Sequence, residues 1–74
     1  MIHHLGIDVR EKCVGDYRAF LYWADSESNR KYEIRGYSLE SFGAAADNAQ
    51  QKFLTDREAY SEYCGPWDAQ KGEA

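Results

Sequence analysis

The sequence predicts a single α+β domain, in which a three-stranded antiparallel meander sheet carries one C-terminal helix on one face (β-β-β-α). Two observations lead to this fold class. Residues 3–37 contain three segments in which apolar side chains recur at every second position, separated by short polar or glycine-containing turns. Residues 38–64 instead carry apolar side chains three and four positions apart, which is the spacing of one side of a helix.

The strands are expected at His3–Cys13, Tyr17–Ala24 and Lys31–Tyr37. In the first of them Leu5, Ile7 and Val9 alternate with polar residues, which indicates a strand with one buried face. Glycine in the turn 14–16 favours a hairpin, and the polar run 25–30 predicts the loop of a second hairpin. Gly36 is expected to end the third strand.

The helix is predicted from an apolar stripe that follows the third strand. Either Ser38 or Ser41 can cap its N-terminus by accepting a hydrogen bond from a free backbone N–H. We expect one long helix with a weak point near Thr55, where a capping-box pattern begins. The stripe consists of Phe42, Ala45, Ala46, Ala49 and Phe53, and it can be extended through Tyr60 and Cys64.

The end of the helix is predicted at Gly65-Pro66, because glycine favours a helix C-terminus and proline cannot continue the helix. Trp67 is expected to fold back onto the helix end. The domain therefore covers residues 1–67, and residues 68–74 are expected to form a flexible C-terminal tail.

The second strand is the most informative segment, because it is apolar or aromatic on both faces. Its odd-numbered residues, from Tyr17 to Trp23, can fill a core beneath the helix. Phe20 and Tyr22 then lie beside Arg18 on the opposite side, where a one-layer sheet would meet water. A second aromatic face of this kind indicates a surface that binds a partner.

The open side of the sheet is therefore the predicted binding surface. Five basic and two acidic groups would give it a charge of +3 and leave −7 elsewhere, so the molecule would be strongly dipolar. Two alternatives are that the aromatic and basic side chains merely shield the sheet, or that two copies pack sheet on sheet as a homodimer. The expected members are His4, Asp8, Arg10, Lys12, Arg18, Phe20, Tyr22, Lys31, Glu33, Arg35 and Tyr37, of which Arg18, Phe20, Tyr22, Lys31, Arg35 and Tyr37 are the predicted partner-binding residues.

Charge and composition narrow the range of functions. The chain has 74 residues and a net charge of −4, which disfavours non-specific binding to nucleic acid. Residues 1–37 are neutral overall, and residues 38–74 carry the whole negative charge. The N-terminus does not resemble a signal peptide and no apolar run is long enough to span a membrane, so a cytoplasmic location and no membrane partner are expected.

Catalytic and metal sites are not predicted. His3 and His4 are adjacent on a strand and point to opposite faces, so they cannot readily share one metal ion. Cys13 and Cys64 are expected to be reduced packing residues rather than a disulfide. Three strands and one helix rarely enclose a catalytic pocket, so we expect neither an enzyme nor a cofactor.

Part of the chain resembles the HicB-like antitoxins. The hairpin at Gly15-Asp16-Tyr17 and the segment from Gly36 to Phe42, Gly-Tyr-Ser-Leu-Glu-Ser-Phe, are similar to the hairpin and the helix start of that family. The resemblance extends from Ile7 to Phe53. It implies a small acidic protein that sequesters a protein partner, often as an oligomer.

A second resemblance is to the plant ethylene-responsive and integrase arm-type DNA-binding domains. It is carried by the spacing Tyr17-x-Ala19-x-Leu21, by Tyr32-x-Ile34-x-Gly36 and by the pair Ala45-Ala46. Those domains place the open face of the sheet in the major groove of DNA. The resemblance implies that the matching contacts would come from Arg10, Arg18, Lys31 and Arg35.

The function predicted from the sequence is a small, acidic, non-enzymatic regulator or inhibitor that binds and occludes a protein partner, as an antitoxin or a phage inhibitor does. Phe20 and Tyr22 would be the buried anchors of the interface, and Arg18 and Arg35 would pair with its acidic groups. The alternative is a DNA-binding module that uses the same face of the sheet.

Overall fold

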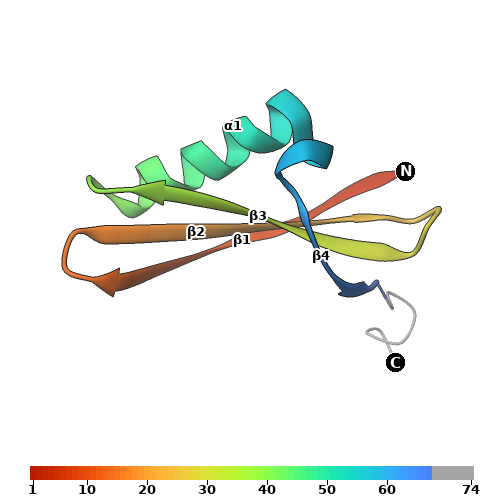
Figure 1. Ribbon diagram of the computed structural model, residues 1–74, viewed down its shortest axis with the longest axis horizontal. Coiled ribbons are helices and arrows are strands. Elements are labelled where there is room, and N and C mark those ends of the chain that lie inside the picture. Colours follow the sequence, from red (N-terminus) through yellow and green to blue (C-terminus); the bar gives the residue numbers. More distant parts are fainter. Residues whose placement is uncertain (68–74) are drawn as a thin grey trace.

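The computed structural model of the chain describes residues 1–67, and the predicted tail lies outside them. Five elements follow one another along the chain (Figure 1): β1 (Ile2–Cys13), β2 (Asp16–Asp25), β3 (Arg30–Ser38), α1 (Phe42–Tyr60) and β4 (Glu62–Pro66). The strands form one antiparallel sheet in the order β1-β2-β3-β4. The predicted α+β class is confirmed, but the sheet has four strands rather than three.

The pairing of β2 with β3 defines the two faces of the sheet. Leu21 lies opposite Ile34, and both are fully buried beneath α1. Because successive side chains alternate between faces, Phe20 and Tyr22 lie on the other side of the sheet. The predicted orientation of the second strand is therefore confirmed. We call the side that carries α1 the helix face and the opposite side the open face.

A bulge in β1 changes which residues of that strand face the helix. From Gly6 to Glu11 the pairing with β2 is regular, but it shifts between His4 and Gly6, where Leu5 is the extra residue. His4 consequently lies opposite Trp23 on the helix face, with its ring 5.7 Å from that of Phe53. The expectation that His4 belongs to the open face was wrong, because strict alternation along the sequence does not allow for the bulge.

The backbone of α1 packs directly on the sheet at Gly36, which lies inside β3, two residues before the strand ends at Ser38, and not at its end as predicted. A Cβ atom on Gly36 would overlap the backbone oxygen of Ala45 and lie 2.6 Å from the backbone nitrogen of Ala49. Both alanines are fully buried. The absence of a side chain at residue 36 therefore lets the helix backbone rest directly on the strand backbone.

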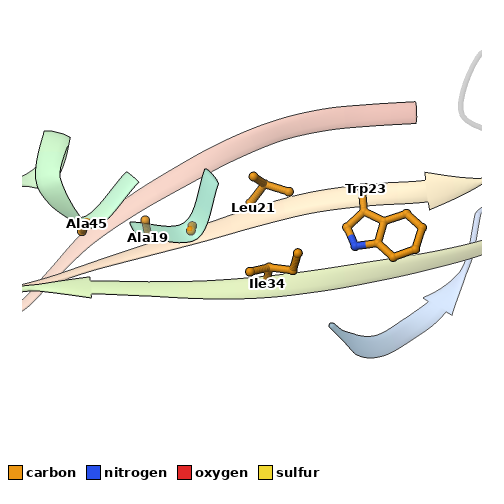
Figure 2. Packing of buried hydrophobic residues seen from close by; sticks show 6 residues of the cluster. Ala19, Leu21, Trp23, Ile34 and Ala45 are labelled. Carbon is orange, nitrogen blue, oxygen red and sulfur yellow. The ribbon is translucent and has the colours of Figure 1, made fainter. Parts of the chain in front are cut away.

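The core widens from this contact toward the C-terminal end of α1. Ala19 and Ala45 fill the narrow end, the paired Leu21 and Ile34 lie next to them, and Trp23 lies beyond this pair toward the wide end (Figure 2). The wide end is filled by aromatic rings: the centroid of Trp23 lies 4.5 Å from that of Tyr32 and 6.2 Å from that of Phe53. Side chains of increasing size thus match the widening gap, and α1 rises away from the sheet along its length (Figure 1).

The start and the weak point of α1 follow the prediction. Ser41 is the N-cap, and its hydroxyl oxygen accepts a hydrogen bond of 3.1 Å from the backbone N–H of Ala44. The helix breaks at Asp56, one residue after the expected Thr55, and a carboxylate oxygen of Asp56 caps the last turn by accepting from the N–H of Ala59.

No helix of residues 1–67 is long and apolar enough to cross a membrane.

The C-terminal end of α1 differs from the prediction, because the helix ends at Tyr60 and residues 62–66 form β4. Ser61 has an extended backbone, and its hydroxyl oxygen accepts a hydrogen bond of 2.7 Å from the indole N–H of Trp23. Tyr63 then pairs with Tyr32 at the edge of the sheet. Pairing with the free edge of β3 outweighs the helical spacing that connects Tyr60 with Cys64.

We expect Gly36→Ala to destabilise the fold by about 1–3 kcal/mol, because the new methyl group would overlap the backbone of α1. Thermal unfolding followed by circular dichroism would show this as a fall in Tm of roughly 5–20 °C. Gly43→Ala in the first turn of α1 is the matched control. Its Cβ would meet only the hydroxyl of Ser41 at 3.9 Å, so it should stabilise the helix by about 0.5–1 kcal/mol. Equal stability of the two variants would contradict the close contact.

Candidate functional site: the open face of the sheet

The open face brings together all six predicted partner-binding residues. The strand register places Arg18 opposite Tyr37, Phe20 opposite Arg35, and Tyr22 opposite Glu33. The remaining predicted residue, Lys31, follows on the same side of β3. Asp8 and Arg10 of β1 extend the row, since they lie opposite Phe20 and Arg18.

Each aromatic ring on this face is paired with a basic side chain from a neighbouring strand. The guanidinium carbon of Arg18 lies 4.7 Å from the ring centroid of Tyr37. Arg10 lies 5.7 Å from Phe20, and the ammonium of Lys31 lies 5.8 Å from Tyr22. These distances are within the range of cation–π attraction. The aromatic side chains therefore lie under a layer of basic ones, and Phe20 and Tyr22 are half-buried.

The charge of the open face is smaller than predicted. Two acidic residues that the sequence did not place there, Asp16 and Glu62, join Asp8 and Glu33. The five basic groups minus these four acidic ones leave a net charge of +1, so the expected value of +3 and the strong dipole were wrong. The ion pairs are Asp8–Arg10 at 3.6 Å, Asp16–Arg18 at 2.8 Å, Glu33–Arg35 at 3.5 Å and Glu62–Arg35 at 3.4 Å.

A hollow of about 440 Å³ lies on the open face where the basic residues are most concentrated. Phe20 contributes its aromatic surface, and three arginines from three strands surround it, together with Lys12. Among residues 1–67, Lys12 forms no ion pair within 4.0 Å, so its charge is available to a ligand. The lining residues are Arg10, Glu11, Lys12, Arg18, Phe20 and Arg35.

The other end of the open face is covered by Trp67. Its backbone N–H donates a hydrogen bond of 2.8 Å to the carbonyl oxygen of Asn29, and its ring centroid lies 4.7 Å from that of His3. His3 pairs with Ala24, which is fully buried although it belongs to the open face. The expectation that Trp67 folds back onto the helix end was therefore wrong, because β4 carries the chain along β3 to this end of the sheet.

The two cysteines lie at the surface of the sheet. Cys13 and Cys64 are free thiols, as expected, but both are exposed, so the expectation that they are packing residues was wrong. Partial burial raises the pKa of Cys64, an effect that the ammonium of Lys31 opposes and the carboxylate of Glu33 reinforces, so the thiol stays protonated at neutral pH. Burial likewise raises the pKa of Tyr22, with Glu33 and Asp8 adding to the effect, so its hydroxyl is neutral.

A second, smaller hollow of about 230 Å³ lies on the helix face at the wide end of the core. Its lining residues are Ile2, Trp23, Asp25, Tyr32, Glu58 and Ser61. Within residues 1–67 no three His, Cys, Asp or Glu side chains are grouped in a way that could hold a metal ion. The larger hollow on the open face therefore carries the stronger case for a binding site.

Comparison with known proteins identifies no relative. The sequence matches no protein-family model, and neither curated proteins nor solved structures include a significant match.

We expect the Asp16–Arg18 pair to make stability depend on pH in the acid range. The hydrogen bond from Arg18 lowers the pKa of Asp16 below its ordinary value of 3.8, so the pair stabilises the fold above that pH. The contribution is lost as the pH falls through the lowered pKa. Thermal melts should show Asp16→Asn less stable than wild type at neutral pH and nearly equal to it in strong acid.

Asp47→Asn is the matched control for this prediction. Asp47 lies on the exposed side of α1 and forms no ion pair within residues 1–67. The proposed contribution of the ion pair would be contradicted if the difference in Tm between wild type and Asp16→Asn stayed constant from neutral to strongly acidic pH.

Proposed function

We propose that this protein is a small non-enzymatic regulator that binds and occludes a protein partner through the open face of its sheet. The observation that carries the proposal is the hollow around Phe20, where aromatic surface lies within reach of three guanidinium groups. Interface hot spots combine these features, because an apolar anchor and a bidentate arginine contact are both strengthened when water is excluded.

The charge balance of the open face favours a protein over a nucleic acid. A DNA-binding surface draws most of its affinity from neutralising phosphates, which requires an excess of basic groups. Here Arg10, Arg18 and Arg35 each have a carboxylate within 3.6 Å, and the face as a whole carries +1. Phosphates would have to approach these carboxylates as well. A DNA-binding module therefore remains only the alternative outcome of the test.

The same geometry suggests the chemistry of the partner segment. An apolar side chain would pack on Phe20, and a neighbouring carboxylate would reach Lys12 and Arg10, the most exposed cations of the hollow. Of the three arginines, Arg10 can most readily exchange its own carboxylate partner for a carboxylate of the ligand. Its side chain is 70 % exposed, and its pair with Asp8 is the longest of the four ion pairs at 3.6 Å. An acidic segment with an aromatic or aliphatic residue is thus the expected ligand of an antitoxin-like or phage-type inhibitor built on this face.

Selection from a random peptide-display library tests the proposal without a known partner. Immobilised wild-type protein should enrich peptides in which Asp or Glu flanks an apolar residue. Phe20→Ala should weaken the binding of an enriched peptide by roughly tenfold or more, and Arg10→Glu should weaken it by a similar factor. Asp47→Lys on the exposed side of α1 is the control and should leave the affinity unchanged.

Two results would contradict the proposal. One is enrichment of peptides whose binding Phe20→Ala and Arg10→Glu do not affect. The other is binding of a random-sequence DNA duplex at physiological salt that falls steeply as salt is raised, which would show a nucleic-acid surface instead.

A further inference from the structure

The outer backbone groups of β3 and of β1 differ in whether they are hydrogen-bonded. The outer edge of β3 is largely covered: β4 pairs with residues 30–33, and α1 supplies two hydrogen bonds beyond them. The ammonium of Lys52 donates to the carbonyl oxygen of Arg35 at 3.0 Å, and the backbone N–H of Tyr37 donates to the side-chain oxygen of Asn48 at 3.1 Å. Within residues 1–67, β1 pairs only with β2, so its outer edge is unpaired.

The unpaired edge also adjoins uncovered apolar surface. Leu5, Ile7 and Val9 of β1 are 41 %, 39 % and 42 % exposed, although the last two lie opposite fully buried residues of β2. A long edge strand with free backbone groups and apolar side chains is a template for pairing with another strand. Natural sheets avoid such pairing with charges at the edge, and β1 carries Asp8 and Arg10 there.

These two charges become complementary when a second copy is placed against β1. In an antiparallel pair about a two-fold axis at Val9, Asp8 of each copy lies opposite Arg10 of the other, and Val9 meets its own counterpart. An axis one residue away, at Asp8 or Arg10, would instead place like charges opposite each other, which is destabilising. An axis at Ile7 would bring the bulge at Leu5 into the pairing two residues from the axis, whereas an axis at Val9 keeps the paired residues 7–11 between that bulge and the irregularity between Glu11 and Cys13.

We propose that β1 is the interface for a second copy of this chain, paired antiparallel about Val9. The axis is perpendicular to the sheet, so the two four-stranded sheets join into one continuous sheet with both copies of α1 on the same side. The two open faces also become continuous. The hollows around Phe20 then lie on both sides of the axis, because Arg10 belongs both to the hollow and to the pairing segment. This dimer does not depend on the proposed function of the open face.

Sedimentation equilibrium of charge-reversal variants tests the register directly. The wild type should dimerise in the micromolar range, and Asp8→Arg or Arg10→Asp alone should weaken the dimer by about tenfold or more, because each places like charges opposite each other twice. Both side chains are more than half exposed, so both variants should fold. A mixture of the two variants should recover the dimer as a heterodimer, since every cross-strand pair then has opposite charges.

The mixing experiment needs a control for non-specific attraction between two variants whose net charges were changed in opposite directions. Asp47→Arg carries the same change of charge as Asp8→Arg but lies on α1. Because Asp47→Arg keeps the wild-type β1, it should form its own homodimer, but its mixture with Arg10→Asp should show no recovered heterodimer, since one pair of like charges remains across the axis. Recovery in this control equal to that in the first mixture would overturn the proposed register.

Hydrogen exchange supplies a readout at the backbone. Amides of residues 6–11 that point away from β2 should become protected as the wild-type concentration is raised, and Asp8→Arg should abolish this change. A wild-type protein that stays monomeric without such protection would overturn the proposal. A dimer insensitive to reversal of Asp8, but lost with Phe20→Arg, would overturn it in favour of packing through the open face.

Discussion

The contact of α1 with the backbone of β3 at Gly36 is the constraint on which the rest of the fold depends. Because no side chain separates the two elements there, Ala45 and Ala49 approach the strand as closely as backbone atoms allow. Asn48 and Lys52, on the same part of the helix, can then bond the edge of β3. The helix is thus held at one end by small residues and lifted at the other by aromatic ones, which leaves its C-terminus beside Trp23.

One helix held in this position cannot cover four strands. A helix with its side chains is about 10–12 Å wide, and neighbouring strands are about 4.8 Å apart, so α1 covers roughly two strands. It lies over β2 and β3, where Leu21 and Ile34 are fully buried, while Ile7 and Val9 of β1 stay about two-fifths exposed. The part of the helix face on β1 is therefore uncovered because α1 lies over β2 and β3.

Features that depend on the local alternation of side chains could be predicted from the sequence. Features that depend on a contact between residues distant in the chain could not. The faces of β2 are readable because Arg18 cannot be buried among Ala19, Leu21 and Trp23. The residues around Gly36 do not indicate that it packs against Ala49, thirteen positions away, so the sequence alone predicts the end of a strand there. Helical spacing from Tyr60 to Cys64 hides β4, whose reason to form is the free edge of β3. With β4 unrecognised, Glu62 was missing from the open face, and so was the position of Trp67.

The missing carboxylates change what the open face can recognise. A surface with an uncompensated charge of +3 would attract any polyanion, whereas one with a balanced set of ion pairs attracts only a ligand that places its own carboxylates better than the resident ones. The Asp8–Arg10 and Glu62–Arg35 pairs are exposed on both sides and individually weak, so exchanging them costs little. Selectivity then comes from position: the ligand must put its charge beside Phe20, where the Asp8–Arg10 pair is long and Lys12 has no partner within residues 1–67. Pairing of β1 would turn Asp8 toward Arg10 of the second copy, so that occupancy of the hollow and assembly of the sheet would compete for the same guanidinium.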